Sequence, residues 1–270
     1  MKYSSGAAFR QALEDRLRAI SLNNGVPLVR LRKMVAFDRF LARLFWHQSD
    51  KWIVKGGFAL QLRLGDRSRT TKDIDMLVLP QNQMIYPALR QAGILDLGDW
   101  FLFDVSDSSG DNRSDNTLKD FGGSRYQIQT LLDGRMFEKF HIDIGVGDPL
   151  LDPVEHLEIP AMLAFAGVEP TLVPCYPITQ QIAEKLHAYT RPYISGQSTR
   201  VKDFVDILLL AELGTFVGEH MFRAIEATFN ARQTHAIPTS LPPAPKEWSR
   251  PYRKMAEEVG LRVIVHDQSE

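Results

Sequence analysis

The stretch of sequence that decides the fold is KGGFAL at residues 55–60, followed after a short gap by RTTKDID at residues 69–75. The apolar run at 52–54 leads into a glycine pair, a pattern typical of a strand that ends in a turn. The run at 73–79 indicates a second, buried strand that stops at Pro80. The sequence therefore predicts two strands connected through a glycine turn and a short helix.

Two aspartates in the second strand are candidates for binding a cation. Asp73 and Asp75 should point together while Ile74 and Met76 face a core, because side chains two residues apart lie on the same face of a strand. The two carboxylates repel each other, and a divalent cation relieves that repulsion. Mg²⁺ often takes one or two carboxylates together with substrate phosphates. An exposed strand that binds nothing would carry the same pair.

A third aspartate, Asp143, lies in another apolar strand predicted over 137–146. An acidic group within an apolar strand is costly unless it is paired, hydrogen-bonded or metal-bound. If this strand lies beside the strand of Asp73 and Asp75, three carboxylates converge, as two-metal phosphoryl or nucleotidyl transfer requires. The alternative is an edge strand whose aspartate faces solvent.

The glycine pair is compatible with phosphate binding. Gly56 and Gly57 let the backbone approach a phosphate closely, and the first amides of the following helix can bind an anion. An ordinary turn would use the same two residues.

The order of predicted elements divides the chain into three regions. Two basic, helical patterns occupy 1–50, strands and helices alternate over 51–175 as in an α/β or α+β sheet domain, and 176–270 is almost wholly helical. The stretch 106–124 is rich in serine, aspartate, asparagine and glycine, which predicts a long loop. That loop could be disordered, a lid or a partner site.

Composition narrows the class of protein further. The 270 residues include 32 basic and 33 acidic side chains, and 44% are hydrophobic, which excludes collagen-like and wholly disordered chains. The first 55 residues nevertheless carry 11 basic against 4 acidic residues, either as a solvated face or as a surface for a polyanion. One cysteine, no apolar run of about 20 residues and no signal-like N-terminus predict a cytoplasmic protein without a membrane segment.

The motifs taken together resemble motif I of the DNA polymerase beta nucleotidyltransferase superfamily. More narrowly, the chain resembles the AbiEii/AbiGii toxin family, which includes the MenT toxins of mycobacteria. EKLHA at 184–188 and RVKDFVD at 200–206 are similar to that family's helical lysine motif and its Arg-x-Lys-Asp-x-x-Asp motif. The matching blocks span 52–210. The resemblance implies an α+β fold with a polymerase-beta-like mixed sheet flanked by helices.

The resemblance also implies a reaction. A nucleoside monophosphate is transferred from an NTP to an acceptor, and pyrophosphate is released. In characterised relatives the acceptor is the 3′ end of tRNA, which blocks aminoacylation and halts growth. The implied protein is the toxin of a type IV-like toxin–antitoxin or abortive-infection system, with a cognate antitoxin as partner.

Carried over residue by residue, the resemblance assigns the catalytic magnesium, or manganese, to three carboxylates, those of Asp73, Asp75 and Asp143. Asp143 would also accept the proton of the attacking hydroxyl. The implied nucleotide-binding residues are Lys55, Gly56, Gly57, Arg69 and Lys185. Of these, Lys185 would neutralise the β- and γ-phosphates. The superfamily commonly has Gly-Ser in place of the glycine pair, so a hydroxyl ligand to phosphate is missing here and the nucleotide preference is open.

Two further acidic residues have two interpretations. Asp203 and Asp206 are catalytic candidates by the same resemblance, but Arg200 and Lys202 are close enough in sequence to form a salt-bridged helix face with them. Arg69 could likewise pair with a neighbouring aspartate, Asp66 or Asp73, instead of binding a phosphate or base. His187 is two residues from Lys185 on a predicted helix and should point elsewhere, as a core or surface histidine.

Two other functions are compatible with the sequence. The same chemistry could modify a small hydroxylated molecule of the aminoglycoside kind, or the chain could bind a nucleotide or an antitoxin without turnover. Acceptor binding that weakens strongly with salt would indicate RNA, and a flat response would indicate a small molecule.

Overall fold

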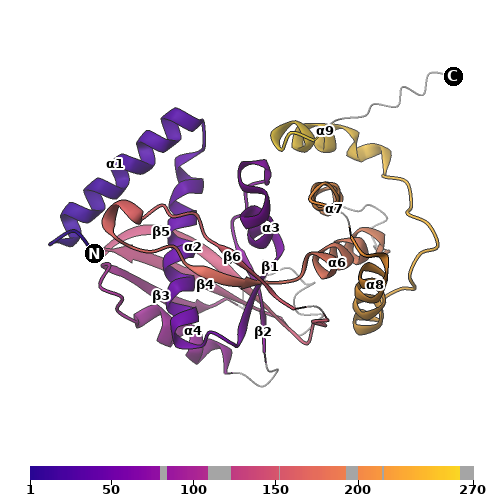
Figure 1. Ribbon diagram of the computed structural model, residues 1–270, viewed down its shortest axis with the longest axis horizontal. Helices are drawn as coiled ribbons and strands as arrows, with labels where there is room; N and C mark the ends of the chain where they lie inside the picture. The colour runs from indigo at the N-terminus through magenta and orange to yellow at the C-terminus, as the bar shows by residue number, and fades with distance from the viewer. Residues whose placement is uncertain (80–83, 109–122, 152, 193–199, 215, 262–270) are drawn as a thin grey trace. The chain divides into compact units, whose positions relative to one another are not determined.

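The computed structural model describes residues 1–79, 84–108, 123–151, 153–192, 200–214 and 216–261 (Figure 1). These residues form two compact units. The first consists of Met1–Leu62, Thr70–Gly147 and Glu155–Cys175, and the second of Arg63–Arg69, Asp148–Val154 and Tyr176–Glu270. The N-terminal helices therefore belong to the unit that contains the sheet, a question that the sequence left open. Most of the loop predicted over 106–124 lies outside the described residues.

The first unit is built on a sheet with the strand order β3-β4-β5-β2-β1-β7-β6 (Figure 1). The strands are β1 Trp52–Lys55, β2 Ile74–Val78, β3 Phe101–Asp107, β4 Ser124–Leu132, β5 Arg135–Val146, β6 Glu155–Glu158 and β7 Leu172–Cys175. Two neighbouring pairs, β2 with β5 and β1 with β7, are parallel, and the other neighbours are antiparallel. The mixed sheet confirms the predicted α+β class.

Two short strands, β6 and β7, were not predicted from the sequence. They are only four residues long, β6 reads EHLE without a hydrophobic alternation, and β7 contains Pro174. Proline lacks the N–H that a ladder needs, so it argues against a strand on sequence grounds alone. Pro174 stands opposite His156 of β6, and the next residue, Cys175, pairs with Val54 of β1.

Helices cover one face of this sheet (Figure 1). They are α1 Gly6–Asn24, α2 Leu28–His47, α3 Gly56–Leu64, which continues to the border of the unit, and α4 Ile85–Ile94. The helix α1 begins where the Ser5 side chain accepts a hydrogen bond from the Ala8 amide, and it ends at Gly25, whose φ is 67°. Its buried stripe joins Ile74, Met76 and the other core-facing strand residues in one hydrophobic core.

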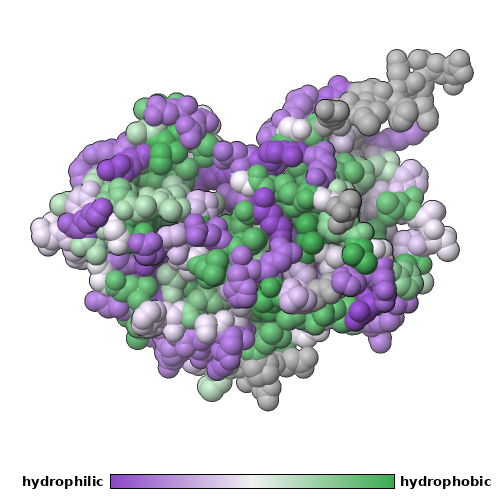
Figure 2. Space-filling model, viewed as in Figure 1, coloured by the Kyte–Doolittle hydropathy of each residue, from purple (hydrophilic) through white to green (hydrophobic). Residues whose placement is uncertain are grey.

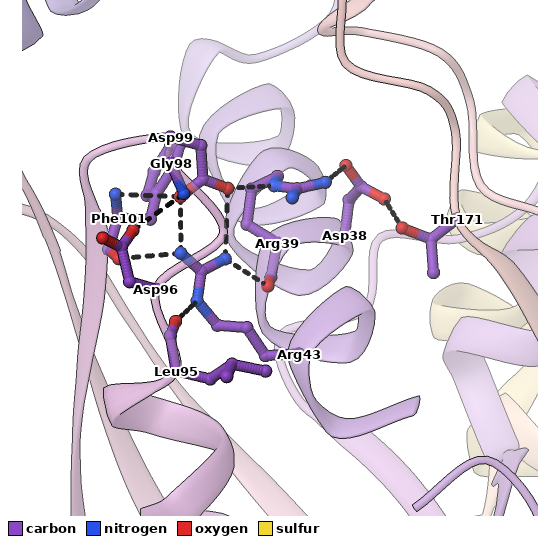
Figure 3. A network of polar contacts seen from close by, with 9 residues as sticks. All are labelled: Asp38, Arg39, Arg43, Leu95, Asp96, Gly98, Asp99, Phe101 and Thr171. Carbon is purple, nitrogen blue, oxygen red and sulfur yellow. Dashed lines mark hydrogen bonds and ion pairs between the residues drawn. The ribbon is translucent and has the colours of Figure 1, made fainter. Parts of the chain in front are cut away.

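A buried network of ion pairs fixes α2 to the segment that precedes β3 (Figure 3). Arg39 Nε lies 2.7 Å from Asp99 Oδ2, and the Arg43 guanidinium pairs with the same carboxylate and donates to the Phe101 carbonyl at 2.8 Å. Burial acts to raise the pKa of Asp99, but Arg43 and Arg39 outweigh it and hold that pKa below its ordinary value. At the other end of the network, Asp38 accepts a hydrogen bond of 2.6 Å from the Thr171 hydroxyl.

Several basic residues near the N-terminus therefore serve the fold. Arg39 and Arg43 are buried, and Arg10 donates to three backbone carbonyls between residues 132 and 136. Arg32 pairs with Glu14 at 2.6 Å, and Lys33 with Glu138 at 3.4 Å. The positive charge of this segment is thus partly internal, which weakens the expectation that it forms a surface for a polyanion.

The second unit is mainly helical, as the sequence predicts. Its helices in the described residues are α6 Ile178–Thr190, α7 Val201–Ala211, α8 Gly218–Arg232 and α9 Ser249–Glu258. The helix α6 packs against both α7 and α8, and α7 packs against α9. The charged contact between Arg67, in the short turn Gly65–Arg67, and Glu212 joins that turn to the end of α7. Within the described residues, none of the helices is both long enough and apolar enough to span a bilayer.

Candidate active site

A row of four charged residues crosses the centre of the sheet in the first unit. Lys55 of β1 is paired with Asp75 of β2, Asp75 with Asp143 of β5, and Asp143 with Arg125 of β4. Residues paired across neighbouring strands point to the same face, so the row lies opposite the face that carries Ile74 and the helix-covered core. The sequence alone did not establish whether the two strands that carry these aspartates are neighbours. The register shows that β2 and β5 are adjacent, with Asp75 opposite Asp143.

Gly56 is required where it stands because the chain turns against the Asp75 carboxylate. Its φ is 58°, and a Cβ at this position would lie 1.9 Å from Asp75 Oδ2. The next amide, that of Gly57, donates to the same oxygen at 3.4 Å. The glycine pair therefore lies against the Asp75 carboxylate, and the absence of side chains at these two positions lets α3 begin directly beside it.

Asp143 is held by an arginine that sequence analysis missed. Arg125 Nε lies 2.7 Å from Asp143 Oδ1, and Arg125 Nη2 lies 2.6 Å from Asp143 Oδ2. This is the two-pronged geometry in which a guanidinium binds a carboxylate most specifically. The Asp143 side chain is only 8% exposed, so the pair meets the requirement that a buried carboxylate has a partner.

Asp73 lies just before β2 and is more exposed than Asp143. Its Oδ1 is 3.3 Å from Nδ1 of His141, and its side chain is 36% exposed. His141 lies two residues before Asp143 on β5, so the same parallel pairing brings Asp73 and His141 together. Sequence analysis gave His141 no role, and the structure places it in contact with Asp73 beside the row of charged residues.

The row contains two acidic and two basic side chains. Neighbouring strands are about 4.8 Å apart, so two ionised carboxylates at that spacing repel by about 3 kcal/mol at an effective dielectric constant of about 20. Lys55 stands beside Asp75 and Arg125 beside Asp143, at the two ends of the row. Among the described residues, no three histidine, cysteine, aspartate or glutamate side chains are gathered as a ready-made metal site.

The donor set nevertheless suits magnesium. Asp75 and Asp143 present carboxylate oxygens from directly paired positions on adjacent strands, and Asp73 follows two residues away on the same side. Such hard oxygen donors are the ligands that Mg²⁺ uses when substrate phosphates complete its shell. The residues fit the ion by chemistry and by register.

The second unit contains a separate cluster of ion pairs around Lys185. Lys185 Nζ lies 2.8 Å from Asp203 Oδ1 and 2.9 Å from Asp206 Oδ2. Arg69 grips Asp206 through Nε at 2.9 Å and Nη2 at 2.8 Å, and Arg200 lies 3.7 Å from Asp203. Arg69 thus pairs with Asp206, and the two neighbours considered from the sequence, Asp66 and Asp73, were the wrong ones.

In this cluster the attraction between opposite charges outweighs the cost of burying Lys185 and Asp206 in their charged forms. Burial acts to lower the pKa of Lys185, but Asp206 and Asp203 outweigh it and raise that pKa above its ordinary value. Burial acts to raise the pKa of Asp206, yet Lys185 and Arg69 hold it below the ordinary value. Lys185 and Asp206 are therefore both charged at neutral pH. The fully buried Asp206 side chain anchors two helices and the Arg69 segment.

His187 is a structural histidine, as expected. It is buried, its Nε2 lies 2.8 Å from the Thr234 hydroxyl, and its ring packs edge-on against Phe229. Burial, together with the positive charge of Arg232, lowers the pKa of His187 to about 3. The neutral ring belongs to the packing between α6 and α8.

Replacing Asp206 by asparagine is expected to lower the free energy of unfolding by about 3 kcal/mol, because Lys185 and Arg69 lose a buried counter-charge. Chemical denaturation measures the change. Asp66→Asn, at an exposed position in the turn before Arg69, is the control and should change stability by less than about 0.5 kcal/mol. A loss of less than about 1 kcal/mol in Asp206→Asn would show that Asp206 is not the counter-charge on which Lys185 and Arg69 depend.

Comparison with solved structures shows a fold similar to that of a known nucleotidyltransferase. MenT4, a nucleotidyltransferase toxin of Mycobacterium tuberculosis H37Rv, is similar over 92% of this chain and 89% of its own, with a TM-score of 0.60 and 18% sequence identity. A nucleotidyltransferase-like protein of Paracoccidioides brasiliensis matches over 77% of this chain and 95% of its own, with a TM-score of 0.47 and 14% identity. A comparison with curated protein sequences gave no match. The fold is that of a nucleotidyltransferase.

Sequence comparison identifies the family. The model of the family described as nucleotidyl transferase AbiEii toxin, type IV toxin–antitoxin system, matches residues 39–263. The chain belongs to this family of nucleotidyltransferase toxins, and the resemblance drawn from its motifs is confirmed.

Proposed function

We propose that this enzyme uses Mg²⁺, or Mn²⁺, to transfer a nucleoside monophosphate from an NTP to an RNA acceptor, the 3′ end of tRNA. It would act in the cytoplasm as the toxin of a pair whose antitoxin restrains it. The observation that carries the proposal is the pairing of Asp75 with Asp143 beside Gly56. Family membership supports the chemistry, and the acceptor is the part that experiment must establish.

The metal would be held by Asp75 and Asp143, with Asp73 as a further ligand. When bound, the ion supplies positive charge that stabilises the phosphates at the reacting centre. A hydroxyl oxygen of the acceptor forms a bond to the α-phosphorus, the bond from that phosphorus to the bridging oxygen breaks, and pyrophosphate leaves. The hydroxyl proton passes to a carboxylate oxygen of Asp143.

The nucleotide would be bound by backbone and cationic groups. Gly56 and Gly57 open α3, whose first amides offer donors to a phosphate, and Lys55 lies directly before them. Lys185 remains charged at neutral pH and is proposed to bind the β- and γ-phosphates, exchanging a carboxylate partner for a phosphate. Since Arg69 is committed to Asp206, we propose that it supports Lys185 through that carboxylate, along with Asp203.

An exposed basic face on α9 supports a polyanionic acceptor. Arg250, Arg253 and Lys254 are three and four residues apart, all are exposed, and with Ser249 and Glu257 they border a hollow of about 280 Å³. Hydrophilic side chains gather over this helix in Figure 2. Such a face suits the phosphates of a nucleic acid better than a small uncharged acceptor.

Replacing these three basic residues by alanine is expected to weaken RNA binding about tenfold at moderate salt. The slope of log affinity against log salt should fall by about 2, because each phosphate contact to a single strand contributes about 0.7. Filter binding over a salt series measures both quantities. Arg223→Ala, at an exposed position on α8, is the control. An unchanged slope in the triple variant would argue against this face as an RNA contact.

A transfer assay tests the proposed function. Purified protein is incubated with Mg²⁺, each labelled NTP in turn and total bacterial RNA, with a parallel incubation in chelator. Label in a tRNA-sized band that disappears with the chelator is the expected result. Label that appears only on added aminoglycosides would replace RNA by a small acceptor. No release of pyrophosphate with either acceptor would indicate a binding protein without turnover.

A further inference from the structure

The contact between Arg125 and Asp143 stands in the way of the proposed metal site. Asp143 is one of the proposed ligands, yet both of its oxygens are taken by Arg125 at 2.7 and 2.6 Å. A carboxylate that is fully engaged with a guanidinium is a poor ligand for a cation until that contact is broken or shared. Metal binding at Asp143 must therefore compete with Arg125.

The register shows why the competing group is an arginine from β4. Arg125 stands directly opposite Asp143 in the antiparallel pair, while Asp75 stands directly opposite in the parallel pair on the other side. Asp143 thus has the acidic residue Asp75 on one side and the basic residue Arg125 on the other. The arginine side chain is 22% exposed, so the guanidinium has access to solvent and need not be expelled into the core.

Charge balance determines what can displace this contact. The row of Lys55, Asp75, Asp143 and Arg125 carries two positive and two negative charges. With Asp73 counted as a further ligand, a divalent cation alone would leave the site with a charge of +1. A triphosphate brings compensating negative charge together with oxygen atoms that a guanidinium binds as well as it binds a carboxylate. The cation and the nucleotide should consequently favour each other's binding, and by linkage the coupling is reciprocal.

We propose that Arg125 is a positioning residue that makes metal binding at Asp143 conditional on nucleotide. In the free protein it neutralises Asp143 and keeps the affinity for a divalent cation low. When the nucleotide binds with its cation, the guanidinium exchanges Asp143 for a phosphate oxygen, and Asp143 becomes available as a ligand. This inference rests on the proposed function, because it assumes that Asp75 and Asp143 hold the cation.

Direct measurement of Mn²⁺ binding tests the proposal without relying on turnover. Mn²⁺ is titrated by calorimetry into the wild type and Arg125→Gln, alone and with α,β-methylene analogues of the four NTPs. In the wild type, the best analogue should tighten Mn²⁺ binding at least tenfold. Arg125→Gln should bind Mn²⁺ alone at least tenfold more tightly than the wild type, and the analogue should add much less to its affinity.

Two further variants keep the test decisive. Arg135→Gln makes the same change at an exposed position at the start of β5 and should behave as the wild type. Arg125→Lys keeps a positive charge without the two-pronged grip and should fall between the wild type and Arg125→Gln, which also covers the case in which the glutamine variant does not fold.

The outcomes separate the two ideas. Nucleotide-dependent Mn²⁺ binding in the wild type, with equal Mn²⁺ affinities in the wild type, Arg125→Lys and Arg125→Gln, would overturn the role of Arg125 and leave the proposed metal site standing. No Mn²⁺ binding by any variant, with or without nucleotide, would overturn both.

Discussion

Asp75→Asn is expected to lower the rate of nucleotidyl transfer at least about a thousandfold while the protein stays folded. Asparagine keeps the size of the side chain and an oxygen that can accept a hydrogen bond from the Gly57 amide. It removes the negative charge at the centre of the row of charged residues. A thousandfold loss corresponds to about 4 kcal/mol of transition-state stabilisation, a magnitude expected for weakening a catalytic metal site. Steady-state transfer of label from NTP measures the loss.

Stability distinguishes lost chemistry from lost structure in this variant. The free energy of unfolding should fall by no more than about 2 kcal/mol, because the relief of repulsion with Asp143 offsets part of the loss of a counter-charge beside the buried Lys55. Asp104→Asn makes the same substitution at an exposed position on β3 of the same sheet and should leave transfer unchanged. An Asp75→Asn protein that labels its acceptor at the wild-type rate would rule out the metal role of Asp75.

The central strands could be predicted because their signals are local. Asp73 and Asp75 follow the period of a strand, and Asp143 is conspicuous as an acid between isoleucines. Both patterns predicted strands, but sequence analysis stated only what would follow if the two strands were neighbours. The paired register of Asp75 and Asp143 shows that they are.

The partners of the charged residues could not be predicted in the same way. Arg69 lies 137 residues from Asp206, and Arg125 lies 18 residues from Asp143 across a hairpin. An arginine has many carboxylates within reach of a flexible chain, and only the tertiary fold selects one. Sequence proximity suggested Asp66 or Asp73 for Arg69, and the packing of the second unit selected Asp206 instead.

Buried charge also limits what could be predicted about the N-terminal segment. The basic residues of residues 1–55 were interpreted as a solvated or a nucleic-acid-binding face, since arginine is seldom buried without a partner. Asp99 supplies that partner for both Arg39 and Arg43 and lies well outside the segment (Figure 3). A count of charge within a window therefore overestimates surface potential where the counter-charge comes from elsewhere in the chain.

Gly56→Ala is expected to lower transfer by about a hundredfold or more. A Cβ at this position would lie 1.9 Å from Oδ2 and 2.5 Å from Cγ of Asp75, so the carboxylate must move. A displacement of about 1 Å in a catalytic group costs on the order of a hundredfold in rate. The alanine must also adopt a φ of 58°, which destabilises the protein by about 1–2 kcal/mol.

Gly25→Ala separates these two effects. Gly25 also has a positive φ, 67°, but a Cβ there would meet nothing within 4 Å, and it ends α1 in the same unit. This variant should therefore lose a similar free energy of unfolding and keep its transfer rate. If Gly56→Ala transferred label as fast as Gly25→Ala at equal folded fractions, the close contact between Gly56 and Asp75 would have no part in catalysis. A selective loss in Gly56→Ala would instead show that the glycine turn is needed to place the Asp75 carboxylate for the reaction.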